Sequence, residues 1–221
     1  DITTDNLGLT RKNGKAKLIA KEDFVLAGRD VFSECIHYME KECDIRWQFN
    51  DGDLVLNKQV AAWLKGDLLQ ILKAERVALN FLGRMCGIAT LTRCFVSETA
   101  GTKCKILDTR KTTPGLRNLE KMAVRAGGGF NHRMDLSSAV MIKDNHIRAA
   151  GSISAAIANI RKKHDGPIEV ECANLTEVRE AVEQRIERIL LDNMSNEQLQ
   201  EARAIIPSVI QVEASGNMTV D

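Results

Sequence analysis

Cationic side chains are concentrated in one stretch of this sequence, and they are the first sign of chemistry in the chain. Between residues 103 and 148 lie Lys103, Lys105, Arg110, Lys111, Arg117, Lys121, Arg125, Arg133, Lys143 and Arg148. The acidic residues in that stretch are Asp108, Glu120, Asp135 and Asp144, whereas the whole chain carries a net charge of only +1. Because arginine and lysine bind carboxylates and phosphates, this local excess of positive charge indicates an anionic ligand.

Polar side chains also follow successive strand-like segments. Five such segments are followed or ended by a polar residue or a glycine: 104–107 by Asp108 and Arg110, 139–142 by Lys143, 168–171 by Glu171, 188–191 by Asp192, and 209–213 by Ser215 and Gly216. In a parallel α/β sheet the carboxyl ends of the strands meet on one rim, where binding sites form. A single aspartate after a strand often only caps the next helix. The whole set is harder to explain in that way, and we interpret it as a binding rim.

The rim divides by charge. Its cationic side contains Arg110, Lys111, Arg133 and Lys143, with His132 nearby. Its anionic side contains Glu171 and Asp192, which could hold a divalent cation or stabilise positive charge on a sugar. Gly127, Gly128 and Gly129 would allow backbone N–H groups to approach an anion, although such a run is more often only a turn. The pattern favours a small polyanionic substrate that reacts at a sugar carbon with help from a metal ion.

The elements that must position these residues fall into two regions. Residues 1 to about 75 predict a small α+β unit with strands at 16–20, 24–26, 44–49 and 59–64. Residues 67–101 predict two helices separated at Gly87, with Leu72 and Val77 on the buried side. From residue 104 onward, strands alternate with helix-length segments at 153–163, 175–184 and 196–205. This alternation predicts a parallel sheet with crossover helices, either closed as a barrel or left open.

Other features exclude several classes of protein. With 221 residues of ordinary globular composition, the chain has no apolar run long enough to cross a membrane and no basic-then-apolar leader. Its six cysteines include no Cys-x-x-Cys pair, so we expect mostly buried, reduced thiols in a cytosolic protein. The sequence lacks a phosphate loop, a dinucleotide fingerprint and a nucleophile elbow, and its histidines lack zinc spacing.

Three motifs resemble those of the quinolinate phosphoribosyltransferase family, also called carboxylating nicotinate-nucleotide pyrophosphorylases. They are 108–115 (DTRKTTPG), 127–133 (GGGFNHR) and 142–146 (IKDNH). Flanking pieces agree, including Asp1–Thr4, Glu75–Arg76, 191–193 and 213–216, so the resemblance extends over nearly the whole chain.

The resemblance implies an α/β fold: an incomplete (β/α) barrel of parallel strands, preceded by a small α+β open-faced sandwich. We place the sandwich domain at residues 1–78 and the catalytic barrel domain at residues 79–221. Five predicted strands are too few to close a barrel, so we expect that the C-terminal strands, and a leading helix, lie outside this sequence.

The resemblance also implies the reaction and its participants. Quinolinate and phosphoribosyl pyrophosphate would give nicotinate mononucleotide, pyrophosphate and CO₂, with Mg²⁺, as a step of NAD biosynthesis. The enzyme would be a cytoplasmic pentosyltransferase and a homodimer with shared active sites, or a higher oligomer.

By the same resemblance, individual residues acquire expected roles. Lys111, Lys143, Glu171 and Asp192 are the expected catalytic residues. Arg110, His132, Arg133 and Lys143 would neutralise the two carboxylates of quinolinate, with Lys111 close to the phosphates. Glu171 and Asp192 would hold the Mg²⁺–pyrophosphate donor or its ribose, and no residue is expected to be a dedicated metal ligand. Ser215 and Gly216 would present backbone N–H groups to a phosphate, and Arg76, otherwise a solvated helix residue, would reach the partner subunit's site.

Two alternatives remain open. One is a related transferase that acts on another heteroaromatic acid, such as the molybdenum-associated relative of this family, although 143–146 favours quinolinate. The other is a non-catalytic protein that binds anions or RNA through the basic stretch. RNA binding normally uses aromatic stacking platforms, and Phe130 is the sole aromatic residue between 103 and 148. We therefore expect neither a nucleic-acid nor a membrane partner.

Overall fold

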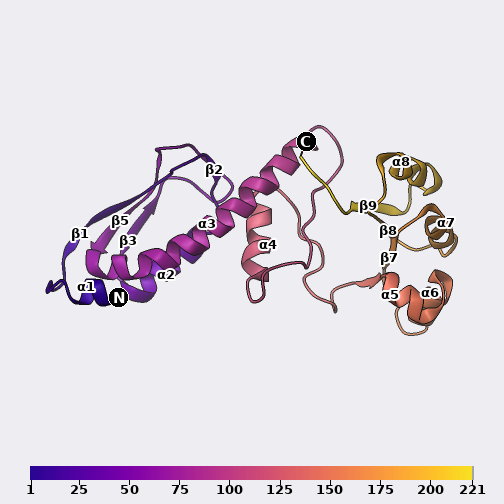
Figure 1. Ribbon diagram of the computed structural model, residues 1–221, viewed down its shortest axis with the longest axis horizontal. Coiled ribbons are helices and arrows are strands. Elements are labelled where there is room, and N and C mark those ends of the chain that lie inside the picture. Colours follow the sequence, from indigo (N-terminus) through magenta and orange to yellow (C-terminus); the bar gives the residue numbers. More distant parts are fainter. Residues whose placement is uncertain (221) are drawn as a thin grey trace. The chain divides into compact units, whose positions relative to one another are not determined.

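A computed structural model describes residues 1–220 and divides the chain into two compact units (Figure 1). The first unit extends from Asp1 to His132 and the second begins at Arg133. In the first unit the helices are α1 (Ile2–Asp5), α2 (Arg29–Met39), α3 (Leu68–Glu98) and α4 (Arg117–Ala126), and the strands are β1 (Asn13–Ile19), β2 (Phe24–Val25), β3 (Asp44–Trp47), β4 (Leu54–Val55) and β5 (Val60–Asp67).

The first unit contains an antiparallel sheet of order β1-β5-β3, and α2 and α3 pack against one of its faces (Figure 1). Side chains alternate along these strands, so that Leu18, Ile45 and Leu64 point toward the helices and join Phe32 and Ile36 of α2 in one core. This arrangement is the expected open-faced sandwich. The short pair β2–β4 extends it.

The helical stretch after β5 differs from its prediction. Instead of two helices separated at Gly87, α3 is continuous from Leu68 to Glu98. A Cβ atom placed on Gly83 or Gly87 would meet nothing within 4 Å, so both glycines lie on an open side of the helix. A helical glycine costs about 0.5–1 kcal/mol, which the buried side of so long a helix can offset. The predicted buried face was also wrong at Leu72 and Val77, which are 49% and 53% exposed.

The predicted strand at 104–107 is almost absent. Among the described residues, Leu107 forms a single parallel bridge with Phe130, and no strand is assigned there. Two hydrogen bonds hold this bridge, from Phe130 N to Ile106 O (2.8 Å) and from Asp108 N to Phe130 O (3.1 Å). One bridge is enough to align the two motif segments, although it makes no ladder.

The three consecutive glycines serve packing rather than anion binding. The N–H of Gly128 donates to Arg125 O and that of Gly129 to Val124 O, which is the hydrogen-bond pattern of a Schellman cap at the end of α4. Gly128 has the positive φ (+95°) that this cap requires. At Gly127 a Cβ would lie 2.5 Å from the carbonyl oxygen of Ala89 in α3. Glycine therefore lets the end of α4 approach α3 closely. The N–H groups of all three glycines donate within this helix end, so the run is a turn rather than an anion site.

The second unit is a segment of (β/α) barrel. Its strands are β6 (Val140–Ile142), β7 (Ile168–Cys172), β8 (Arg188–Asp192) and β9 (Gln211–Ser215), all parallel and in the order of the sequence. Its helices are α5 (Asp144–Ala150), α6 (Ile153–Arg161), α7 (Leu175–Glu183) and α8 (Asn196–Ile205). The helices lie on one side of the sheet, where Ile168, Val170 and Ile189 are completely buried against them (Figure 1).

The expected domain boundary at 78/79 falls inside α3 and stays a prediction. All six cysteines are free thiols, but Cys94 and Cys104 are exposed rather than buried. Within the described residues, no helix has the length and apolar character needed to span a membrane.

Candidate active site

Lys143 and Glu171 form an ion pair at the carboxyl end of the parallel sheet. Lys143 directly follows β6, Glu171 is the fourth residue of β7, and the Lys143 ammonium contacts the Glu171 carboxylate. The N–H of Lys143 donates to His146 Nδ1 at 2.9 Å, in a capping box that begins α5. The motif at 142–146 thus fixes the backbone of Lys143 and leaves its side chain 41% exposed.

Asp192 and Ser215 lie side by side at the same edge, as register partners on β8 and β9. Asn193 ties the two strand ends together. Its N–H donates to Ser215 O at 2.8 Å and its side-chain amide donates to Asp192 Oδ2 at 2.8 Å. Gly216 follows with φ +95° directly against the Asn193 side chain. This edge of the sheet therefore contains Lys143, Glu171, Asp192, Ser215 and Gly216, as the strand-end argument predicted.

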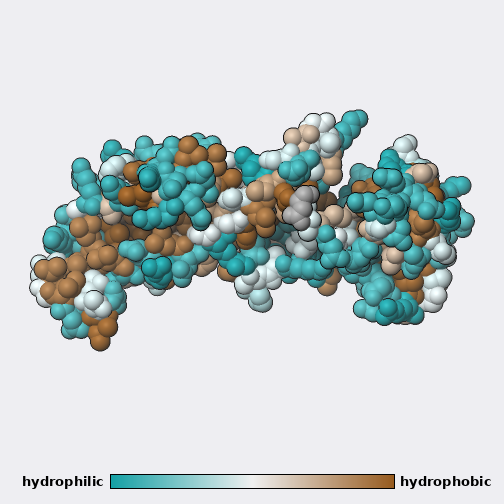
Figure 2. Space-filling view, turned by 45° about the horizontal axis from the view of Figure 1, so that its top comes forward, coloured by the Kyte–Doolittle hydropathy of each residue, from teal (hydrophilic) through white to brown (hydrophobic). Residues whose placement is uncertain are grey.

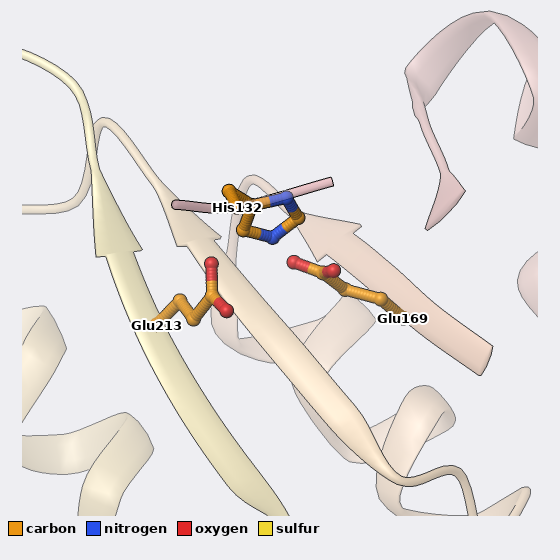
Figure 3. Close-up of side chains that lie close together, drawn as sticks. All are labelled: His132, Glu169 and Glu213. Carbon is orange, nitrogen blue, oxygen red and sulfur yellow. The ribbon is translucent and has the colours of Figure 1, made fainter. Parts of the chain in front are cut away.

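One layer deeper on this face is a charged group that the sequence did not single out. Glu169 of β7 and Glu213 of β9 extend from the same face of the sheet on either side of β8 (Figure 3). Arg188 of β8 lies between them, with Nη1 2.9 Å from a Glu213 oxygen and 3.9 Å from a Glu169 oxygen. The signal was present in the sequence, because Glu169 precedes Glu171 by two residues and must point to the same face.

Arg133 has a clear structural contact. Its Nη1 donates to the carbonyl oxygen of Ala139 at 2.9 Å, just before β6 begins, and Nη2 lies 3.5 Å from the sulfur of Met141. The guanidinium therefore closes the loop from 134 to 139 onto the first parallel strand. Its expected role in binding a carboxylate stays a prediction.

In the first unit, the Asp108 carboxylate connects the first two motifs. It accepts hydrogen bonds from the Lys121 ammonium, from the Asn131 side-chain amide and, at 2.9 Å, from the N–H of His132. Asp108 and Lys121 have side chains only 6% and 2% exposed. We expected Asp108 at the rim as a reactive group, and the structure instead uses it internally. Lys121 had no expected role.

Arg110 and Lys111 follow in the same loop. The carbonyl oxygen of Arg110 accepts from Thr112 N (3.0 Å) and from Arg117 Nη2 (3.3 Å), which holds the backbone. Arg110 Nε is buried and has no hydrogen-bond partner among residues 1–220. Lys111 is exposed. A buried guanidinium N–H without a partner is costly unless a ligand supplies the acceptor, and this fits the expected anion-binding role of Arg110.

A second ion pair holds the remainder of this loop. Arg84 of α3 donates through Nε to a Glu120 oxygen at 2.8 Å and also contacts Thr113 Oγ1, while the other Glu120 oxygen accepts from Thr113 N at 3.3 Å. Burial acts to raise the pKa of Glu120, but the hydrogen bonds from Arg84 and Thr113 outweigh it and lower the pKa. A charged carboxylate thus links α3 and α4 to the loop.

Arg76 lies in the N-terminal third of α3 and is exposed, with exposed Leu72 and Val77 as close neighbours on the helix. Exposed hydrophobic residues also occur elsewhere on the N-terminal part of the molecule, among hydrophilic ones (Figure 2). Arg76 was expected to act away from its own subunit, and its exposure leaves it available for such a contact.

Chemically, the second unit presents two carboxylates, one ammonium group and a hydroxyl group on a single edge. The first unit presents an arginine and a histidine on segments joined through Asp108. The cationic groups can bind an anion, and carboxylates beside them can stabilise a positive centre that develops during a reaction. This set of groups suits a group transfer from an anionic donor.

Comparison with known proteins places the chain in a family. The model of the quinolinate phosphoribosyl transferase N-terminal domain matches residues 1–86, and that of the C-terminal domain matches residues 88–221. A probable carboxylating nicotinate-nucleotide pyrophosphorylase of Synechocystis is 43% identical over all of this chain and 76% of its own length. The corresponding Bacillus subtilis protein is 39% identical, over all of this chain and 77% of its own.

Solved structures agree. NadC from Streptococcus pyogenes superposes with a TM-score of 0.93 at 41% identity, covering all of this chain and 79% of the other. Nicotinate-nucleotide pyrophosphorylase from Ehrlichia chaffeensis superposes with a TM-score of 0.95 at 37% identity, over all of this chain and 80% of the other. The motifs, the two-part fold and these relatives lead to one conclusion: the chain belongs to the quinolinate phosphoribosyltransferase family.

Proposed function

We propose that this chain transfers the phosphoribosyl group from phosphoribosyl pyrophosphate to quinolinate, giving nicotinate mononucleotide, pyrophosphate and CO₂ in NAD biosynthesis. The names of its relatives support this activity, since two are named probable carboxylating nicotinate-nucleotide pyrophosphorylases and one solved structure is named a nicotinate-nucleotide pyrophosphorylase. The observation that carries the proposal is the edge of the sheet where the Lys143–Glu171 pair lies in the same row as Asp192 and Ser215.

In this proposal, the cationic residues hold the dicarboxylate. Arg110, His132, Arg133 and Lys143 neutralise the two carboxylates of quinolinate and orient its ring nitrogen toward the sugar. Arg110 Nε, which has no hydrogen-bond partner among the described residues, is one donor ready for such a contact. Lys111 lies on the same loop and is assigned to the phosphates. Positioning two reactants in this way can supply several kcal/mol of rate enhancement, about 7–11 in the most favourable cases.

The carboxylates act on the sugar. As the bond between the ribose C1 and pyrophosphate breaks, positive charge develops on C1, and Glu171 and Asp192 stabilise it. The ring nitrogen forms the new bond to C1. The carboxylate next to that nitrogen then leaves as CO₂, and the ring carbon takes up a proton. Ser215 and Gly216 bind a phosphate of the donor through backbone N–H groups.

We further propose that Mg²⁺ accompanies the donor. Glu171 and Asp192 offer the oxygen ligands that Mg²⁺ prefers, and Mg²⁺ is usually bound by one or two carboxylates together with substrate phosphates. The deeper pair, Glu169 and Glu213, is less suitable because Arg188 already lies between the two carboxylates. Bound Mg²⁺ would neutralise charge on the leaving pyrophosphate.

The active form is proposed to be a homodimer in the cytoplasm, with Arg76 of one subunit reaching the site of the other. Exposed Leu72 and Val77 beside Arg76 support a contact there, because apolar side chains on a helix surface favour burial by a partner. The free state of all six cysteines agrees with a reducing compartment.

The purified protein, supplied with quinolinate, phosphoribosyl pyrophosphate and Mg²⁺, should form nicotinate mononucleotide and CO₂ in equal amounts. Omission of Mg²⁺ should abolish turnover. A Lys143→Ala variant should lose activity, whereas Lys162→Ala, which removes a distant exposed lysine of the same unit, should retain it. Turnover of nicotinate with quinolinate inert would refute the proposed substrate.

The shared site has its own test. Arg76→Ala and Lys143→Ala subunits should each be inactive alone, and a verified heterodimer of the two should recover activity at the site that has both native residues. If that heterodimer stays as inactive as its parents, Arg76 does not cross between subunits.

A further inference from the structure

We propose that the buried ion pair of Lys121 and Asp108 is a positioning device for His132, and that it sets the affinity for the dicarboxylate substrate. This inference rests on the proposed function and goes beyond it, because Lys121 had no expected role and Asp108 was expected at the rim rather than inside the fold. Both belong to the first unit, and both have almost completely buried side chains, 2% exposed for Lys121 and 6% for Asp108.

The pair fixes the backbone on both sides of His132. Asp108 Oδ1 accepts the His132 N–H at 2.9 Å, and the Lys121 ammonium donates to the His132 carbonyl oxygen at 3.0 Å. The ammonium also contacts Asp108 Oδ1, so carboxylate, ammonium and peptide groups close a ring around one residue. A residue held at both its N–H and its C=O has little backbone freedom left, and its side chain projects in a defined direction.

The same network ties His132 to the loop that contains Arg110. The Asn131 side-chain amide donates both to Asp108 Oδ2 and, at 2.9 Å, to the Lys121 carbonyl oxygen. Asp108 therefore receives hydrogen bonds from two consecutive residues of the second motif. Because Arg110 is only two residues from Asp108, a shift of this carboxylate would move both His132 and Arg110.

Stability alone does not explain such a pair. Burying an ammonium and a carboxylate costs solvation that their attraction often fails to return, and apolar residues can serve a core equally well. Here the atoms of the pair also form hydrogen bonds with neighbouring residues: Asp108 accepts from His132 and Asn131, and the Lys121 ammonium donates to His132. The charges also cancel locally, so that Asp108 does not repel the carboxylates of an incoming substrate.

The experiment compares Lys121→Met with two other variants. In Lys121→Met the carboxylate is left unpaired, and we expect the KM for quinolinate to rise about ten- to a hundredfold, while that for phosphoribosyl pyrophosphate stays within about threefold. The double variant Lys121→Met/Asp108→Asn removes the stray charge and keeps an oxygen for the His132 N–H. Its KM for quinolinate should lie closer to the wild-type value, with at least about a third of the rise in log KM reversed.

Lys105→Met is the matched control. It also removes one positive charge from the first unit, but Lys105 is exposed and lies over the Phe130 ring at 5.0 Å, without contacting His132. Both KM values should stay close to wild type. Active-site titration and thermal melting correct each rate for the folded fraction, because a purely structural pair would lower the amount of active enzyme and leave both KM values unchanged.

If Lys121→Met does not fold, Asn131→Ala provides a milder test, since it removes one amide and keeps the ion pair. It should raise the KM for quinolinate by about threefold or more, because it removes the hydrogen bonds of this amide to Asp108 Oδ2 and to the Lys121 carbonyl oxygen. A folded Lys121→Met with both KM values unchanged, or raised alike, overturns the proposal. An inactive wild-type enzyme would refute the proposed function instead, and the two failures are therefore distinguishable.

Discussion

Replacing Gly216 by alanine tests the structure of the proposed phosphate-binding end of β9. Gly216 has φ +95°, and a Cβ atom there would lie 2.0 Å from Asn193 Oδ1, 2.5 Å from its Cγ and 3.1 Å from its Cα. The first two contacts can be relieved if the Asn193 side chain rotates. The third is with backbone and remains, so the loop itself must also yield.

The cost has two parts. The left-handed conformation costs a non-glycine residue about 1–2 kcal/mol. Rotation of Asn193 gives up its hydrogen bonds with Asp192 (2.8 Å) and Asn217 (3.2 Å), each worth about 0.5–1.5 kcal/mol. We expect Gly216→Ala to lower the free energy of unfolding by about 2–5 kcal/mol.

Gly151→Ala is a matched control in the same unit. Gly151 has φ +94°, but a Cβ atom placed on it meets nothing within 4 Å. This variant therefore pays only the conformational strain, about 1–2 kcal/mol. The difference between the two variants isolates the contact with Asn193.

Urea denaturation of the two variants and the wild type measures these free energies, and steady-state kinetics measures the KM for phosphoribosyl pyrophosphate. Because Asn193 joins Asp192 to Ser215, Gly216→Ala should also raise that KM, whereas Gly151→Ala should leave it unchanged. Equal destabilisation by the two substitutions would refute the argument from close contact. A normal KM in Gly216→Ala would remove this loop from the proposed donor site.

Three further predictions concern packing, pH and thiols. Gly127→Ala should lower the free energy of unfolding by about 1–3 kcal/mol, because its Cβ atom would lie 2.5 Å from a carbonyl oxygen of α3. Gly87→Ala has open space around its Cβ atom and should instead raise the free energy of unfolding by about 0.4–1 kcal/mol. Urea denaturation measures both changes. The pKa of Glu120 is below its usual 4.5, so its ionised form contributes stability above pH 4.5 that disappears as the pH falls through the lowered value. Thermal melting should therefore show a deficit of Glu120→Gln against wild type that shrinks in acid; a deficit independent of pH would contradict this. Burial raises the pKa of Cys172 to about 12, so a thiol reagent should modify exposed Cys94 in the native protein and reach Cys172 only on unfolding, as peptide mass mapping would show.

Sequence periodicity predicted the second unit well. The helix expected at 196–205 has those bounds in the structure, and those expected at 153–163 and 175–184 end within two residues of their predicted ends. Their signals are local, since Ser152, Asn174 and Ser195 cap the three helices through their own side chains. The alternation of strands and helices also predicted correctly that the polar residues at the strand ends of this unit lie on one edge of the sheet.

Predictions failed where the answer depended on what packs opposite a residue. Gly87 resembles a helix break in sequence, but α3 continues because its other side is buried along much of its length. Leu72 and Val77 match a buried helical pattern, and only the fold decides that nothing within the described residues buries them. The strand predicted at 104–107 failed because a strand needs a neighbour to pair with, and within the described residues this segment has one bridge, from Leu107 to Phe130.

The sequence by itself determined the family motifs, the alternation of strands and helices, and the row of polar groups at the strand ends. These depend on spacing along the chain, which periodicity and helix caps report directly. The tertiary structure alone decided that Asp108 is internal, that Lys121 is buried against it and that Lys143 pairs with Glu171. It also decided that the three glycines serve packing. Each of these depends on atoms that are distant in sequence, and such contacts are set by how the elements pack against one another.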